Sequence, residues 1–163
     1  MKIYIGSDHT WYELKEKLKI YLAELGMGYE VMDKGAFSYD KDDDYPDFIT
    51  PVAKAVAEDK ESRGIIIGGS GQGEAMCANR VLGVRAAVFY GEAVAQNAID
   101  IKGEKSTDPY EIVKLARIHN DANILSVGVR FLSEDQIKFA VEFFLKTEFK
   151  NEERHVRRIK KLG

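Results

Sequence analysis

A single carboxylate, Glu74, follows a glycine-rich stretch at the point where an apolar run gives way to a helix-like run. The stretch "GGSGQGE" (68–74) comes directly after "RGIII". Free backbone amides gather in such a loop and bind an anion. A carboxylate that faces these amides can remove a proton while the amides hold the resulting oxyanion, which suits proton abstraction next to a carbonyl group.

A structural interpretation of the same stretch stays open. The loop lacks the GK[ST] ending of a phosphate-binding Walker loop and the spacing of a dinucleotide-binding GxGxxG, so by itself it indicates only an anion site or a tight turn under a helix. An acid in the first turn of a helix also stabilises the helix dipole by about 0.3–1 kcal/mol. Glu74 therefore has both a catalytic and a structural interpretation.

Three other groups of polar residues are candidates for a site. Asp8 and His9 follow the first apolar run in "GSDH", where the acid could also cap a helix. His119 stands in the polar cluster "RIHNDAN" before the last apolar run. Arg154 and Arg158 lie four residues apart, on one face of a helix, and form either a phosphate clamp or a solvated basic helix end.

Alternating strand-like and helix-like segments position these residues. The third strand-like run, "RGIIIGG", is apolar throughout, as in a parallel strand that is covered on both faces. Strands are expected at residues 2–6, 29–35, 63–69, 84–91 and 122–130, and helices at 12–26, 45–59, 73–83, 109–118, 133–147 and 151–162. This order predicts an α/β fold: a Rossmann-like three-layer αβα domain with a mainly parallel five-stranded sheet and C-terminal helices. Ligands bind such a sheet where its strands end.

Length and composition restrict the class of protein. We expect residues 1–163 to form a single domain, and the formal net charge of −3 gives no general attraction to nucleic acid or anionic membranes. One cysteine, Cys77, excludes an internal disulfide framework. No apolar run reaches the roughly 18 residues of a membrane span, and the first residues read as a strand and not as a signal peptide. The sequence predicts a soluble cytoplasmic protein without a metal site.

One segment interrupts the regular alternation. "AIDIKGEKSTDPYE" (98–111) is polar and contains a glycine and a proline, which predicts an exposed inserted loop. It precedes "RIHND", so we expect it to influence any pocket to which His119 contributes.

The ordered motifs resemble a known family, the type B ribose-5-phosphate isomerases and the related galactose-6-phosphate isomerase subunits. The matching stretches are "GSDH" (6–9), "DKG" (33–35), "DYPD" (44–47), "GGSGQGEAMCANR" (68–80), "GVRAA" (83–87), "HNDAN" (119–123), "GVR" (128–130) and "RHVRR" (154–158). They cover nearly the whole chain outside the inserted segment. The resemblance implies interconversion of ribose 5-phosphate and ribulose 5-phosphate through a cis-enediolate, with no metal and no organic cofactor.

The resemblance also implies roles for individual residues. One branch of the family uses a cysteine as base at the position of Gly68, which Cys77 does not match, whereas the other uses a glutamate that Glu74 matches. Asp8 and His119 fall where the family opens the sugar ring. The implied substrate-binding residues are Asp8, His9, Gly69, Ser70, Gly71, Gln72, Gly73, Asn120, Arg130, Arg154 and Arg158, with Ser70 assisting catalysis and Asn120 as an anion-hole partner.

The family shares its active site between two subunits, so the resemblance implies a homodimer or a tetramer of paired dimers. A phosphorylated sugar is the expected partner, and neither nucleic acid nor membrane is. Two alternatives remain: an isomerase of a hexose 6-phosphate of allose or galactose type, and a non-catalytic sugar-phosphate binding module. A carboxylate facing an anionic ligand would weaken a pure binder, which favours the enzyme.

Overall fold

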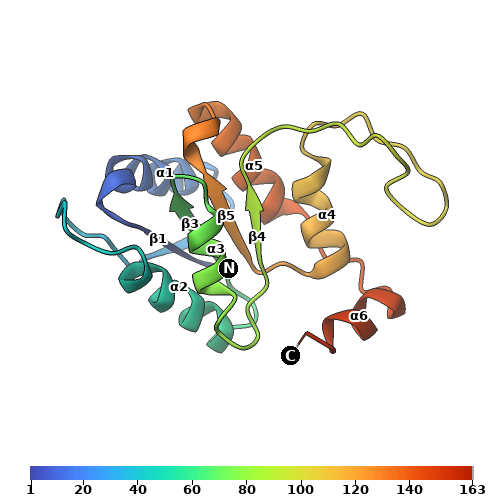
Figure 1. Cartoon of the computed structure of the whole chain (residues 1–163), viewed down its shortest axis with the longest axis horizontal. Helices are drawn as coiled ribbons and strands as arrows, with labels where there is room; N and C mark the ends of the chain where they lie inside the picture. The colour runs from blue at the N-terminus through green and yellow to red at the C-terminus, as the bar shows by residue number, and fades with distance from the viewer. Residues whose placement is uncertain (163) are drawn as a thin grey trace.

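The computed structural model describes residues 1–162 and contains one five-stranded sheet (Figure 1). Every pair of neighbouring strands is parallel, in the order β2-β1-β3-β5-β4. The strands are β1 (Lys2–Ser7), β2 (Glu30–Asp33), β3 (Arg63–Gly68), β4 (Ala86–Phe89) and β5 (Ile124–Gly128). The predicted parallel sheet of five strands is confirmed.

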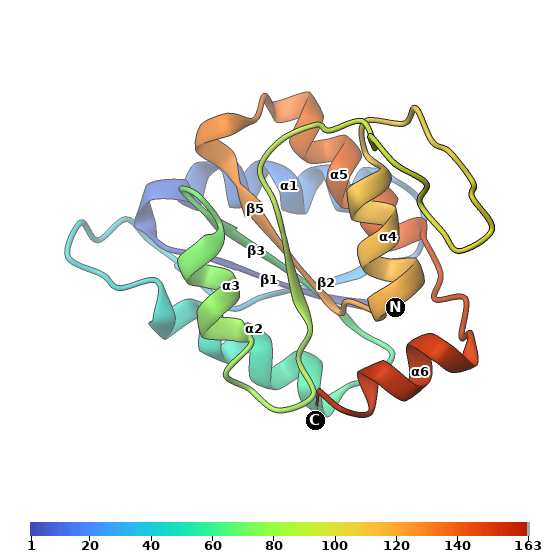
Figure 2. The same cartoon turned by 45° about the vertical axis from the view of Figure 1, so that its right-hand side comes forward.

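Helices cover both faces of this sheet (Figure 2). They are α1 (Tyr12–Glu24), α2 (Pro46–Glu58), α3 (Gln72–Ala78), α4 (Glu111–Asn120), α5 (Glu134–Lys146) and α6 (Glu153–Ile159). One apolar core packs α1, α4 and α5 on one face, and a second packs α2 and α3 on the other. The predicted three-layer Rossmann-like fold is therefore confirmed. Helix α6 lies away from the sheet, below the C-terminal end of α4 (Figure 2).

The central strand β3 explains how the site edge is built. Its isoleucines Ile65, Ile66 and Ile67 are fully buried, because helices cover both faces. In the strand register Ser7 of β1 pairs with Ile67, and Gly68 of β3 pairs with Gly128 of β5. Three strands thus end at the same level, and the loops that follow them meet at one edge of the sheet.

Several elements are shorter than the sequence predicts. Helix α3 ends at Ala78 and not at residue 83, because the Asn79 side chain bonds the backbone of Ala86 in both directions, with distances of 3.0 and 2.8 Å. Strand β4 covers only four residues, Ala86–Phe89, instead of 84–91. Strand β5 ends at Gly128, after which a 3₁₀ turn (Val129–Phe131) carries Arg130 toward the site edge.

The segment between β4 and α4 contains no helix or strand and is mostly exposed. Figure 1 shows it as the yellow loop that reaches beyond α4. The two ends of the loop are tied together: Ala93 N–H donates to the Pro109 carbonyl (3.0 Å), and the Tyr110 hydroxyl donates to the Glu92 carboxylate (2.7 Å). In the part of the chain that the structure describes, no helix has the length and apolarity needed to cross a membrane.

Candidate active site

The glycine loop after β3 is shaped by close packing against β5. Gly71 has a φ of 73°, in the left-handed region that suits glycine, and its carbonyl accepts a 2.5 Å hydrogen bond from Ser126 Oγ. A Cβ on Gly128 would lie 2.4 Å from the Ser70 carbonyl oxygen. The backbone from residue 69 to 73 therefore has a tightly constrained path at the sheet edge.

Glu74, in the first turn of α3, is buried, with 7% of its surface exposed. Its carboxyl group lies directly over Gly68, where an added Cβ would come within 1.9 Å of Glu74 Cδ. Only glycine at position 68 leaves room for this side chain. A cysteine at 68, as in the other branch of the resembling family, would compete for the volume that the Glu74 carboxyl occupies.

Burial makes Glu74 a stronger base than an exposed glutamate. Desolvation is the largest influence and raises the pKa of the carboxyl group. A backbone hydrogen bond opposes this, the negative charge of Asp8 raises the pKa further, and the positive charge of Arg130 lowers it. A raised pKa brings a carboxylate closer to the value that suits proton transfer near neutral pH.

Asp8 and Arg130 lie at the same edge of the sheet as Glu74, where the strands end. The Asp8 carboxylate accepts a 3.0 Å hydrogen bond from Thr10 N–H, so the capping interpretation of this residue holds alongside any functional one. Arg130 N–H donates to the Gly69 carbonyl (3.1 Å), and its guanidinium lies 2.9 Å from where a Cβ on Gly69 would stand. We call the group Asp8, His9, residues 68–74 and Arg130 the loop group.

His9 is held by a carboxylate from a distant part of the chain. Its Nδ1 lies 2.5 Å from Asp43 Oδ1, and its backbone N–H donates to Asp43 Oδ2 (3.1 Å). The hydrogen bond to Asp43 is the main cause that raises the pKa of His9. The ring of Tyr39 packs edge-on against the imidazole at 5.3 Å. The bond to Asp43 orients the imidazole ring and favours its charged form, which is suited to an anionic ligand.

A second set of predicted residues gathers around α6. His119, Asn120, Arg154 and Arg158 line a cavity of about 360 Å³ together with His155 and residues 98–101. We call these four predicted residues the helix group. The His119 ring stacks on His155, with centroids 4.4 Å apart. Burial, and then the charge of Arg154, lower the pKa of His119, so the neutral imidazole is favoured at neutral pH.

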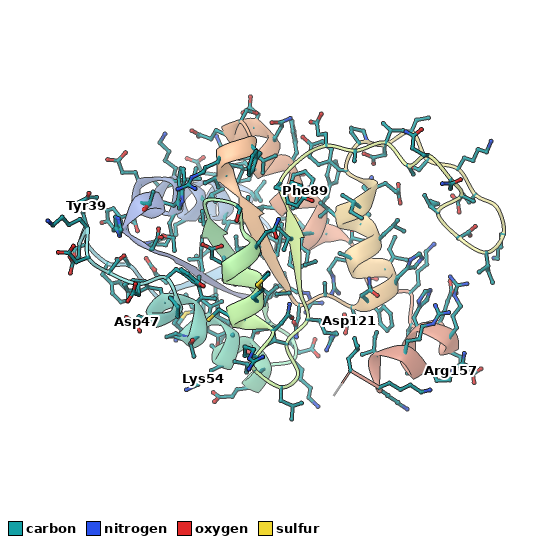
Figure 3. All side chains as sticks on the ribbon, in the orientation of Figure 1. Tyr39, Asp47, Lys54, Phe89, Asp121 and Arg157 are labelled. Atoms are coloured by element: carbon teal, nitrogen blue, oxygen red, sulfur yellow. The ribbon has the colours of Figure 1, made fainter. Side chains whose placement is uncertain are left out.

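One chain does not bring the two groups together. Glu74 follows the C-terminal end of β3, whereas His119 lies near the end of α4, just before β5 begins at the opposite edge of the sheet. Helix α4 has ten residues and so spans about 15 Å. Figure 3 shows this separation: Tyr39, which packs on His9, and Arg157 of α6 are labelled at opposite ends of the molecule.

Sequence reasoning missed two residues that contact these groups. Asp43 precedes the quoted motif "DYPD", but nothing in the sequence indicates its pairing with His9, 34 positions away. His155 lies within "RHVRR", and its stacking on His119 depends on how α6 folds back on α4.

Comparisons with known proteins identify the family and the fold. A model of the ribose/galactose isomerase family matches residues 3–104 and 106–162. The ribose-5-phosphate isomerase B of Mycolicibacterium paratuberculosis is 37% identical over 98% of this chain and 87% of its own length. The Clostridium thermocellum ribose-5-phosphate isomerase B structure is 39% identical, with a TM-score of 0.82 over 100% of this chain and 95% of that one.

A third relative was solved with a sugar phosphate. The ribose-5-phosphate isomerase B of Mycoplasma genitalium, with bound ribulose-5-phosphate, is 34% identical and has a TM-score of 0.82 over 99% of this chain and 93% of that one. Sequence and fold therefore agree over nearly the whole length. The chain belongs to the ribose/galactose isomerase family.

Proposed function

We propose that residues 1–163 form one domain that interconverts ribose 5-phosphate and ribulose 5-phosphate. Relatives at 34–39% identity carry the name of this activity over nearly the full chain, and one of them binds the product sugar phosphate. The observation that carries the proposal is the buried Glu74 carboxyl over Gly68, beside the glycine loop. A module that only bound anions would gain nothing from a buried carboxylate at that place.

Glu74 acts as the base in this mechanism. Its carboxylate removes the proton from carbon 2 of the open-chain aldose, which gives a cis-enediolate with the negative charge on the oxygen of carbon 1. The hydroxyl proton on the oxygen of carbon 2 passes to the oxygen of carbon 1, and Glu74 returns its proton to carbon 1, which gives the ketose. The amides of residues 69–73 hold the negative enediolate oxygen, and the Ser70 hydroxyl assists them. The raised pKa of Glu74 supports this role, because it brings the base closer in strength to the group that it deprotonates.

His119 and Asp8 open the furanose ring, since sugar phosphates are mostly cyclic, and Asn120 contributes to the anion hole. His9, Arg130, Arg154 and Arg158 bind the phosphate and the sugar. Because the loop group and the helix group lie at opposite edges of the sheet, we infer that each site combines the loop group of one subunit with the helix group of a second. A homodimer is the smallest assembly that completes such a site.

Replacement of Glu74 tests the proposal. Glu74→Gln keeps the shape and removes the basicity, so kcat should fall by at least about 10³-fold while affinity for inorganic phosphate stays within about twofold. The assay is solvent deuterium exchange into ribose 5-phosphate, followed by NMR. Cys77→Ala is the matched control in the same helix and should keep wild-type turnover. If the wild type exchanges no deuterium into any pentose or hexose phosphate, the chain is a binding module.

A further inference from the structure

The segment 98–101 belongs to the wall of the cavity that holds the helix group. Ala98, Ile99, Asp100 and Ile101 line it from one side, and Arg154 and Arg158 of α6 contribute to the same lining. Figure 2 shows the loop descending from the top of α4 toward α6. A ligand clamped by the two arginines therefore lies against residues of the inserted segment.

Backbone hydrogen bonds give this wall a defined shape. Asp100 Oδ1 accepts hydrogen bonds from the N–H groups of Lys102 and Glu104, both at 2.9 Å. Ile99 N–H donates to the Glu104 carbonyl at 2.7 Å, which closes the turn from the other side. The tie between Ala93 and Pro109 holds the base of the loop. The tip is thus an ordered turn that presents Asp100 to the cavity.

Asp100 is a charged group with an unused oxygen. The hydrogen bond from Glu104 N–H is the largest influence on its carboxyl group and, together with the bond from Lys102 N–H, holds the pKa below the usual value against the opposing effect of burial, so it is ionised at neutral pH. Both of these bonds reach Oδ1, and no residue within 1–162 hydrogen-bonds Oδ2. A free carboxylate oxygen accepts a hydrogen bond from a sugar hydroxyl and repels a phosphate group.

We propose that residues 98–101 determine which sugar phosphate the site accepts: Asp100 binds a sugar hydroxyl and keeps the phosphate on the side of Arg154 and Arg158, while Ile101 limits the length of the sugar. This inference rests on the proposed isomerase function and adds a specificity wall to it. Ile101 is 78% exposed, so the fold does not need its side chain. Bulk at the wall disfavours a hexose 6-phosphate, which is one carbon longer than a pentose 5-phosphate.

Two point variants test the wall. Asp100→Asn keeps the Oδ1 acceptor of the turn and removes only the charge; it should raise KM for ribose 5-phosphate about five- to tenfold and leave inhibition by inorganic phosphate equal or stronger. Ile101→Ala should shift the ratio of kcat/KM for allose 6-phosphate to that for ribose 5-phosphate upward by about tenfold, at the low end of the roughly 10- to 200-fold by which one methylene group discriminates in a hydrophobic pocket. Val94→Ala, on the same loop but outside the cavity lining, should change neither quantity.

The outcomes separate the two proposals. If the wild type isomerises ribose 5-phosphate and both wall variants keep the wild-type KM, inhibition and substrate ratio within about twofold, the wall has no role in specificity and this inference is wrong. If Asp100→Asn weakens the binding of ribose 5-phosphate and of inorganic phosphate equally, Asp100 does not bind the sugar hydroxyl. A wild-type protein that isomerises neither sugar would refute the proposed function, and the specificity wall with it.

Discussion

The loop group and the helix group are built in opposite ways. In the loop group, backbone packing determines the geometry: Gly68 and Gly128 leave no room for a Cβ, and Gly71 needs a left-handed backbone. In the helix group, exposed or half-buried side chains extend from α4 and α6, and a loop outside the sheet completes the cavity that they line. The group that holds the proposed base therefore tolerates little change, whereas the group proposed to meet the rest of the sugar can vary without disturbing the core.

The strongest test of the two-group arrangement is complementation between inactive chains. Glu74→Gln lacks a working loop group and His119→Ala lacks a working helix group, so each homodimer should be nearly inactive. Random mixing gives half heterodimers, each with one intact site of two, so activity should return to about a quarter of the wild-type value. Refolded mixtures with verified heterodimers provide the measurement. Heterodimers as inactive as their parents would mean that both residues act within one chain.

A single methyl group should disable the loop group. In Gly68→Ala the new Cβ would overlap the Glu74 carboxyl, so the base must move by an ångström or more. A displacement of this size costs on the order of 10²-fold in kcat. Gly91→Ala is the control, because nothing lies within 4 Å of its added Cβ and its φ is not positive. Steady-state kinetics provide the measurement. A Gly68→Ala enzyme that is folded and has a normal kcat would contradict the proposed position of the base.

The arginines of the helix group should respond through binding and not through turnover. Removal of the charge-assisted contact in Arg158→Ala should raise KM for phosphorylated sugars about ten- to a hundredfold, which corresponds to about 1.5–3 kcal/mol. Arg158→Lys should restore the affinity only partly, because lysine lacks the planar fork. Arg157→Ala, the neighbour outside the cavity lining, is the control. An unchanged KM would identify α6 as a solvated basic helix end.

The smallest effect should depend on pH. Asp43 raises the pKa of His9, so the wild-type imidazole stays charged as the pH rises past the ordinary value, and in Asp43→Asn it loses its charge at a lower pH than in the wild type. If the charged ring binds the substrate, KM of the variant should match the wild type at pH 5.5 and exceed it by about tenfold at pH 7.5. Asp42→Asn serves as the exposed control. The same KM ratio at both pH values would exclude a charge role for His9.

The sequence predicts the fold well where patterns are periodic and local. The buried run at Ile65–Ile67 and the amphipathic helix with Ile49 and Val56 reflect packing against a covered sheet, and both lie in the expected elements. The predicted end of helix α3 was wrong, because the Asn79 side chain bonds the backbone of Ala86 where the next helical turn would continue. Such a stop depends on a strand seven residues later, which local helix preference does not reveal.

The candidate site divides along the same line. The sequence identifies Glu74 as a candidate from its position behind the glycine loop, because a strand-to-helix turn determines where a side chain in the first helical turn points. The sequence does not predict the partners of His9 and His119, since Asp43 and His155 come close to them only in the folded chain. The roles of the predicted residues stay predictions until the variants are measured.

The overlap between position 68 and the Glu74 carboxyl restricts how this chain could change its base. In the proposed mechanism, a cysteine at Gly68 would displace the Glu74 carboxyl before the thiol could act, and loss of Glu74 first would leave the chain without its base. Either single step passes through an impaired enzyme, so the two positions are epistatic. An exchange of base in this chain would therefore require both substitutions together.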